Sequence, residues 1–215
     1  MSAAEIAIST ERLRLRPYRL SDHGDMHALM SRPEVNLYPQ RDPFSEEESW
    51  TRLLRHLGHW AEFGYGFLAV EDRATGRFIG EAGFSFFRRG LGEAYSQTPE
   101  ATWTIAPEHQ GQGYASEAAA AAHEWADRTL GLGRTLCMIH PANAPSLAVA
   151  DKLGYREIGR PVFRGEPVIF FERGSRRQCG ARTRVEVASA GNVLCCRDKG
   201  GASRRRRAMK PAILR

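Results

Sequence analysis

Residues 109–118, which read HQGQGYASEA, have the residue types and spacing best suited to chemistry in this chain. Gly111 and Gly113 would let the loop backbone approach a ligand without a Cβ between them. The alanine-rich run 119–126 predicts a helix, and the first N–H groups of a helix have no internal partner. Because the helix dipole adds partial positive charge at that end, the loop is suited to hold an anion such as a pyrophosphate.

The segments around this loop predict a strand before it and a helix after it, within one mixed sheet. Residue periodicity and turn signals predict strands at 11–16, 65–71, 77–87, 101–106, 134–140, 155–160 and 166–172, and helices at 23–31, from Ser45, from the loop to about residue 130, and from Asn143 to Gly154. Residues 88–98 are expected to form a loop. This order favours an α/β or α+β domain whose sheet is flanked by helices.

Composition divides the chain into a body and a tail. Of the 215 residues, 42% are hydrophobic, which is enough for one domain with a core. Residues 174–215 hold 12 Lys and Arg against two acids, whereas residues 1–173 are mildly acidic. We therefore predict a folded domain over 1–173 and a basic, disordered tail over 174–215.

Several classes of function are not favoured. No apolar run is long enough to span a bilayer and the N-terminus has no signal-peptide pattern, so a cytoplasmic location is expected. Three of the four cysteines lie in the tail without metal-site spacing, and His23 and His27 have no third ligand, so no metal is predicted. Cys137 is interpreted as a small core residue. The Arg204–Arg207 run would give at most a weak, salt-sensitive nucleic-acid contact.

Two sequence blocks together resemble the GNAT superfamily of acetyltransferases. Gln110, Gly113 and Ala115 fit the pattern Q/R-x-x-G-x-G/A, and the stretch Glu100 to Ala118 resembles the branch of ribosomal-protein N-terminal acetyltransferases, which modify alanine or serine. Asn143-Ala144-Pro145-Ser146 and Lys152-Leu153-Gly154-Tyr155 resemble the downstream blocks N-x-x-S and K-L-G-F/Y. The resemblance covers residues 10–173, and two blocks in order are more specific than a lone glycine loop.

The resemblance implies a mixed, mostly antiparallel sheet with a V-shaped cleft for acetyl-CoA. The cleft would open between strands 101–106 and 134–140, and the N–H groups that follow the glycine loop would bind the pyrophosphate. Ile105 and Ala106 would pair with the pantetheine arm like an added strand, and Asn143 would hydrogen-bond its end. The cofactor-binding residues implied are Ile105, Ala106, Gln110, Gly111, Gln112, Gly113, Tyr114, Ala115, Ser116 and Asn143.

Acyl transfer to an amine needs a base, oxyanion donors and a proton for the departing thiolate. Glu100 and Glu81 are the candidates for the base, the alternative being ordinary strand carboxylates. A backbone N–H near Ala106 is the expected oxyanion donor. The tyrosine that many family members place two residues before Lys-Leu-Gly is replaced by Ala150, so Ser146 is the candidate acid, unless it only supports its helix cap.

The sequence thus predicts an acetyl-CoA-dependent N-acetyltransferase in which a primary amine attacks directly in a ternary complex. The alternative is a catalytically inactive CoA-binding sensor or interaction module of the same fold, because fold alone does not fix function. The acceptor is left open between a small-molecule amine and a protein N-terminal amine. The acidic body slightly favours cationic acceptors. Both a monomer and a homodimer are compatible with the sequence.

Overall fold

The computed structural model describes residues 6–38 and 42–174, so the predicted tail lies outside the described residues apart from Gly174. The strands are β1 (Ile8–Ser9), β2 (Leu13–Pro17), β3 (Phe67–Asp72), β4 (Phe78–Ser85), β5 (Glu100–Ile105), β6 (Arg134–Ile139), β7 (Arg156–Gly159), β8 (Val162–Phe163), β9 (Glu166–Pro167) and β10 (Ile169–Gly174). The α-helices are α1 (His23–Met30), α2 (Glu46–Phe63), α3 (Glu93–Ser96), α4 (Tyr114–Trp125) and α5 (Ala144–Lys152).

Eight of the described strands form one mixed sheet in the order β1-β2-β3-β4-β5-β6-β10-β7. Every neighbouring pair is antiparallel except β5 and β6, which run parallel. A parallel pair needs a crossover, and the glycine loop with α4 provides it. The mixed, mostly antiparallel sheet expected from the sequence is therefore present.

The helices begin where the sequence signals predict them. Ser45 caps α2, because its side chain accepts a hydrogen bond from the Glu48 N–H. The Glu48 carboxylate in turn accepts from the Ser45 N–H, which completes a capping box. Asn143 caps α5 by accepting from the Ser146 N–H at 3.2 Å. One prediction was wrong in detail, because the 88–98 segment contains the single helical turn α3.

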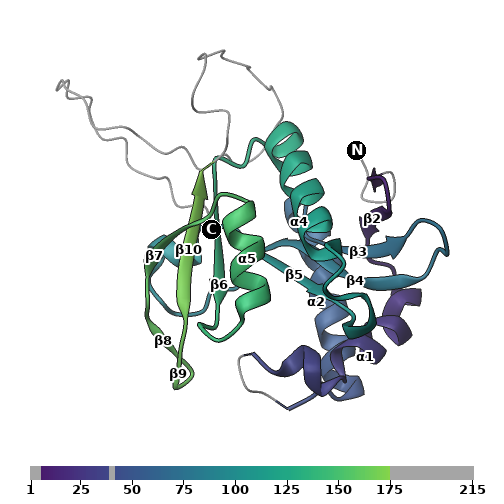
Figure 1. Cartoon of the computed structure of the whole chain (residues 1–215), viewed down its shortest axis with the longest axis horizontal. Helices are drawn as coiled ribbons and strands as arrows, with labels where there is room; N and C mark the ends of the chain where they lie inside the picture. The colour runs from purple at the N-terminus through teal and green to yellow at the C-terminus, as the bar shows by residue number, and fades with distance from the viewer. Residues whose placement is uncertain (1–5, 39–41, 175–215) are drawn as a thin grey trace, which may run out of the picture. The chain divides into compact units, whose positions relative to one another are not determined.

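The two faces of the sheet carry different helices (Figure 1). Small residues of α4, including Ala118 and Ala122, pack with Ala101 and Ile105 of β5 in one core. On the opposite face, Leu53 of α2 packs with residues such as Met26 of α1 and Phe67 of β3. The alanines of α4 let that helix lie close to the sheet, which brings its N-terminus to the end of β5.

No helix in the described ranges 6–38 and 42–174 is both long and apolar enough to cross a membrane.

Candidate active site

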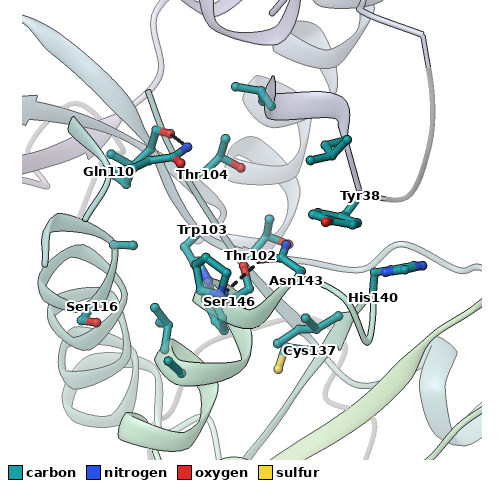
Figure 2. Close-up of a pocket in the computed structure, with 18 of the residues that line it drawn as sticks. Tyr38, Thr102, Trp103, Thr104, Gln110, Ser116, Cys137, His140, Asn143 and Ser146 are labelled. Carbon is teal, nitrogen blue, oxygen red and sulfur yellow. Dashed lines mark hydrogen bonds between the residues drawn. The ribbon is translucent and has the colours of Figure 1, made fainter. Parts of the chain in front are cut away.

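The parallel strands β5 and β6 pair at one end only and then separate. Their register joins Glu100 to Leu136, and the Leu136 N–H donates to the Pro99 carbonyl at 2.9 Å. A cleft of about 680 Å³ lies beyond this point, lined by residues 102–105 of β5, the glycine loop, the end of β6 and the start of α5 (Figure 2). The V-shaped opening that was expected between these two strands is thus present.

The separation leaves part of the β5 backbone facing the cleft. The Ala106 N–H donates to the Ile79 carbonyl of β4 at 2.9 Å. Because main-chain groups alternate along a strand, those of Trp103 and Ile105 face the other way, toward β6. Beyond the paired end these groups border an open edge, where the Ile105 carbonyl accepts from the Gln110 side chain. An extended ligand could add to the rest of this edge like a strand.

The same bonds limit what Ala106 can do. Its N–H is occupied by Ile79, and its carbonyl accepts from the His109 N–H at 2.8 Å. Ala106 is buried on the α2 side of the sheet and is not among the residues that line the cleft. The N–H groups of Trp103 and Ile105 are therefore better placed than that of Ala106 to serve as oxyanion donors.

The glycine loop has the backbone geometry that its sequence suggests. Gly111 has φ of +73° and Gly113 φ of +84°, values that strain any residue with a Cβ. Gly113 is the N-cap of α4, and the first main-chain bond there runs from the Glu117 N–H to the Gly113 carbonyl. The N–H groups of Tyr114, Ala115 and Ser116 precede that bond, and all three residues line the cleft.

Gln110 and Gln112 have roles within the loop itself. The Gln110 amide donates to the Ile105 carbonyl at 2.8 Å and so ties the loop to the end of β5 (Figure 2). The Gln112 side chain donates to the Glu108 carbonyl at 3.2 Å, and Gln112 does not line the cleft. Gln110 therefore shapes the cleft wall, while Gln112 lies on the outside of the loop.

Arg12 contacts the glycine loop, and the sequence reasoning missed this residue. Its guanidinium donates to the Gln112 carbonyl at 3.0 Å, pairs with Glu117 of α4 at 2.6 Å, and lies 4.3 Å from the centre of the Tyr114 ring. Arg12 thus braces the loop, while Glu117 of α4 balances its charge. No local signal could have found it, because it lies about 100 residues away in the sequence, between β1 and β2.

The far side of the cleft is formed by the start of α5 and the end of β6. The Asn143 oxygen accepts from the Ser146 N–H, and both residues are half-buried in the lining (Figure 2). His140 accepts a hydrogen bond at Nδ1 from the Ala142 N–H at 3.1 Å, and its ring stacks on Tyr38 at 5.0 Å between ring centres. Tyr38 follows α1, so the stack joins the two sides of the cleft mouth.

Glu81 lies on the α2 side of the sheet with none of its surface exposed. It pairs with Arg52 of α2 and accepts a hydrogen bond from the Tyr18 hydroxyl at 3.0 Å, with His56 Nε2 at 3.5 Å. Burial alone would raise the pKa of Glu81, but Arg52 and His56 outweigh burial and lower that pKa to about 2. Glu81 does not line the cleft, although its cross-strand partner Thr104 does.

Glu100 is held in a similar way at the start of β5. Both of its carboxylate oxygens accept from the Arg89 guanidinium, at 2.8 and 3.0 Å, and the residue is buried. Glu100 does not line the cleft either, but Thr102, two residues along the same face of β5, does. The structure therefore places each candidate base in an arginine pair beside the cleft and not in its wall.

Cys137 and Ala150, which the sequence analysis also considered, are both buried. Cys137 of β6 is 1% exposed within the core, and burial raises the pKa of its thiol well above the usual range, which agrees with its interpretation as a core residue. Ala150 is fully buried in α5. Among the described residues, no group of three or more His, Cys, Asp or Glu side chains could hold a metal ion.

The family can be read from comparison with known proteins. The model of the acetyltransferase (GNAT) domain matches residues 12–156, which include β2 to β6 and every residue that lines the cleft except Val168. The chain belongs to the GNAT acetyltransferase family. It is therefore an acyltransferase, and the cleft is its candidate active site.

Individual relatives agree with this assignment. The chain is 31% identical over 152 residues to YnaD, an uncharacterized N-acetyltransferase of Bacillus subtilis, covering 71% of this chain and 84% of YnaD. A solved GNAT-family acetyltransferase structure from Bordetella pertussis is 34% identical, with a TM-score of 0.73 and coverage of 79% and 100%. A Vibrio cholerae spermidine N-acetyltransferase in complex with CoA and spermine shares the fold at 20% identity, with a TM-score of 0.62 and coverage of 77% and 97%.

Proposed function

We propose that this GNAT protein transfers the acetyl group of acetyl-CoA to a primary amine by direct attack in a ternary complex. The observation that carries the proposal is the coincidence of two features at one cleft: the unpaired edge of β5 and the open N-terminus of α4. The first suits an extended arm with amide groups, and the second suits a pyrophosphate. Acetyl-CoA has both, and the family and the CoA-bound relative support it as the donor.

The residues of the cleft divide the work of binding. The N–H groups of Tyr114, Ala115 and Ser116 would hold the pyrophosphate, with Arg12 bracing the loop from behind. The Ile105 N–H and the Trp103 carbonyl would pair with the pantetheine arm, which leaves the Trp103 N–H for the reaction itself. The acetyl end would then lie near Asn143 and Ser146, at the start of α5.

Three groups would serve the reaction itself. The Trp103 N–H, further along β5 from the glycine loop, would donate to the oxyanion, in a place where a fixed donor needs no reorganisation. The Ser146 hydroxyl would donate a hydrogen bond or a proton to the departing thiolate. The Asn143 amide, whose oxygen already accepts from the Ser146 N–H, would keep two N–H donors for the ligand.

Proton removal from the amine is proposed to occur through water. A base is most effective when its pKa lies near the working pH, and a pKa of about 2 makes Glu81 a weak one. Both oxygens of Glu100 are already engaged by Arg89. We therefore propose that the two carboxylates position their arginines, and that water in the cleft takes the proton from the attacking amine.

The finer assignment to the ribosomal-protein branch rests on the sequence motif alone and is also a proposal. The decisive experiment measures release of free thiol from acetyl-CoA with a panel of primary amines, coupled to mass spectrometry of each amine. Thiol release equal to N-acetylated product supports the proposal. Tight CoA binding without acetylation of any amine would instead support the inactive sensor.

A further inference from the structure

An arginine-rich surface lies beside the cleft on the α2 side of the sheet. It consists of Arg52, Arg55, Arg89 and Arg164, which we call the arginine patch. The Arg55 and Arg89 guanidinium groups lie 5.6 and 4.2 Å from the centre of the Phe87 ring. Arg89 and Arg164 lie 5.1 and 5.3 Å from the centre of the Phe163 ring. The rings of Phe87 and Phe163 thus each contact two guanidinium groups, and they share Arg89.

The patch carries more positive charge than its carboxylates can balance. Arg52 is paired with Glu81, and Arg89 with Glu100. Among residues 6–38 and 42–174, the structure gives neither Arg55 nor Arg164 an ion pair with a carboxylate, and both side chains belong to exposed residues. Although Arg55 is exposed as a residue, partial desolvation of its guanidinium and the neighbouring charges of Arg52 and Arg89 lower the pKa of that group, with Glu81 only partly opposing them.

This excess of cations contrasts with the rest of the domain, where acids slightly outnumber bases. Guanidinium groups crowded together repel one another, and a bound anion relieves that repulsion. A planar guanidinium also offers paired N–H donors that match a carboxylate or a phosphoryl group. The patch therefore has the charge and the donor chemistry to bind such a group.

The patch adjoins the cleft on the side opposite to the proposed donor site. Directly paired residues of neighbouring strands share a face, so Thr104 lies on the same face as Glu81 and Ala69. Thr102 and Glu100 lie on that face too, because they are separated from Thr104 by even steps along β5. Both threonines line the cleft (Figure 2). The cleft floor is thus flanked by the two arginine–carboxylate pairs, while the glycine loop and α4 lie on the other face.

We propose that the acceptor is a small primary amine that carries an oxyanionic group, a carboxylate or a phosphoryl group, and that Arg55 of the arginine patch binds this group. The inference rests on the proposed function, since it names the class of amine that enters from the α2 side. Arg52 and Arg89, whose charges their glutamates already balance, position the floor, and Arg55 supplies the free donors. The acceptor preference is then the reverse of the slight cationic preference expected from the acidic body.

The test compares pairs of related primary amines, one with and one without an anionic group. Binding to the CoA-saturated enzyme is measured by calorimetry for leucine and leucinamide, phenylalanine and phenylalaninamide, and 2-aminoethylphosphonate and ethanolamine. The anionic member of at least one pair is expected to bind about tenfold more tightly, the scale of one charge-assisted hydrogen bond. The amino acids and the phosphonate distinguish a carboxylate site from a phosphoryl site.

Variants assign the effect to the patch. Arg55→Gln is expected to remove most of the preference, and Arg55→Lys to restore part of it, with CoA affinity unchanged in both. Arg128→Gln changes an exposed arginine, just after α4, that pairs with Glu124. It is the matched control and is expected to keep the full preference. Three results would overturn the inference. The uncharged amines could bind as tightly as the anionic ones or more tightly, no anionic amine could bind, or the Arg55 and Arg128 variants could have equal effects. Anionic preference without thiol release would overturn the proposed function alone.

Discussion

Replacing Glu81 by Gln tests whether this carboxylate acts as a buried ion-pair partner or as the general base. Glu81 is fully buried against Arg52, Tyr18 and His56, and its pKa is lowered from 4.5 to about 2. A carboxylate whose pKa is lower in the folded than in the unfolded protein stabilises the fold at pH values above the unfolded-state pKa. This contribution is lost as the pH falls from about 4.5 toward 2. The shift corresponds to roughly 3 kcal/mol of folding free energy at neutral pH.

Glu81→Gln is therefore expected to lower the free energy of unfolding by about 3 kcal/mol at pH 7, since it also leaves Arg52 buried without its counterion. Urea unfolding measured between pH 7 and pH 3 should show the gap to the unaltered protein narrowing on acidification. Glu157→Gln, which removes an exposed partner of Arg160, is the control and should change little.

Two results would refute this reasoning. A Gln variant as stable as the unaltered protein at pH 7 would show that the Glu81–Arg52 pair does not hold the fold. A stable variant whose turnover falls by more than about a hundredfold would show instead that Glu81 is the base, because removal of a general base has effects of that size.

Four further predictions concern the cleft. Gly113→Ala, at φ of +84°, should destabilise the protein by about 1–2 kcal/mol and weaken CoA binding in calorimetry, whereas Gly58→Ala, in open space within α2, should not. Arg12→Gln should raise the KM for acetyl-CoA more than it lowers kcat, as steady-state kinetics would show. Ser146→Ala should lower kcat while CoA affinity is kept, and full turnover would remove Ser146 from the mechanism. The pH profile of kcat/KM should rise to the pKa of whichever amine is used, and a limb at about pH 6–7 common to all amines would indicate a protein base.

Much of the fold followed from local signals in the sequence. The capping box at Ser45 and Glu48, the N-cap at Asn143 and the glycine loop each depend on residues within a few positions of one another. Such features are set by local hydrogen bonds and allowed backbone angles, so a single sequence reveals them. The order of these elements then indicated a mixed sheet, as the structure has it.

The parts that could not be predicted depend on long-range contacts. Arg12 braces a loop about 100 residues away, and Arg52 and Arg89 neutralise the two glutamates that were candidates for the base. Nothing near these arginines in sequence indicates their partners. The Ala106 N–H faces Ile79, because strand pairing decides which groups remain free along β5. Catalytic roles therefore needed the register of the sheet as well as the motif.

The most direct test of the central claim is a crystal structure of this protein with CoA. The account predicts the pyrophosphate within hydrogen-bond distance of the N–H groups of Tyr114, Ala115 and Ser116, and the pantetheine arm paired with Trp103 and Ile105 along the open edge of β5. Its thiol should end near Ser146. CoA bound away from the start of α4, or a pantetheine arm outside the gap between β5 and β6, would contradict the account.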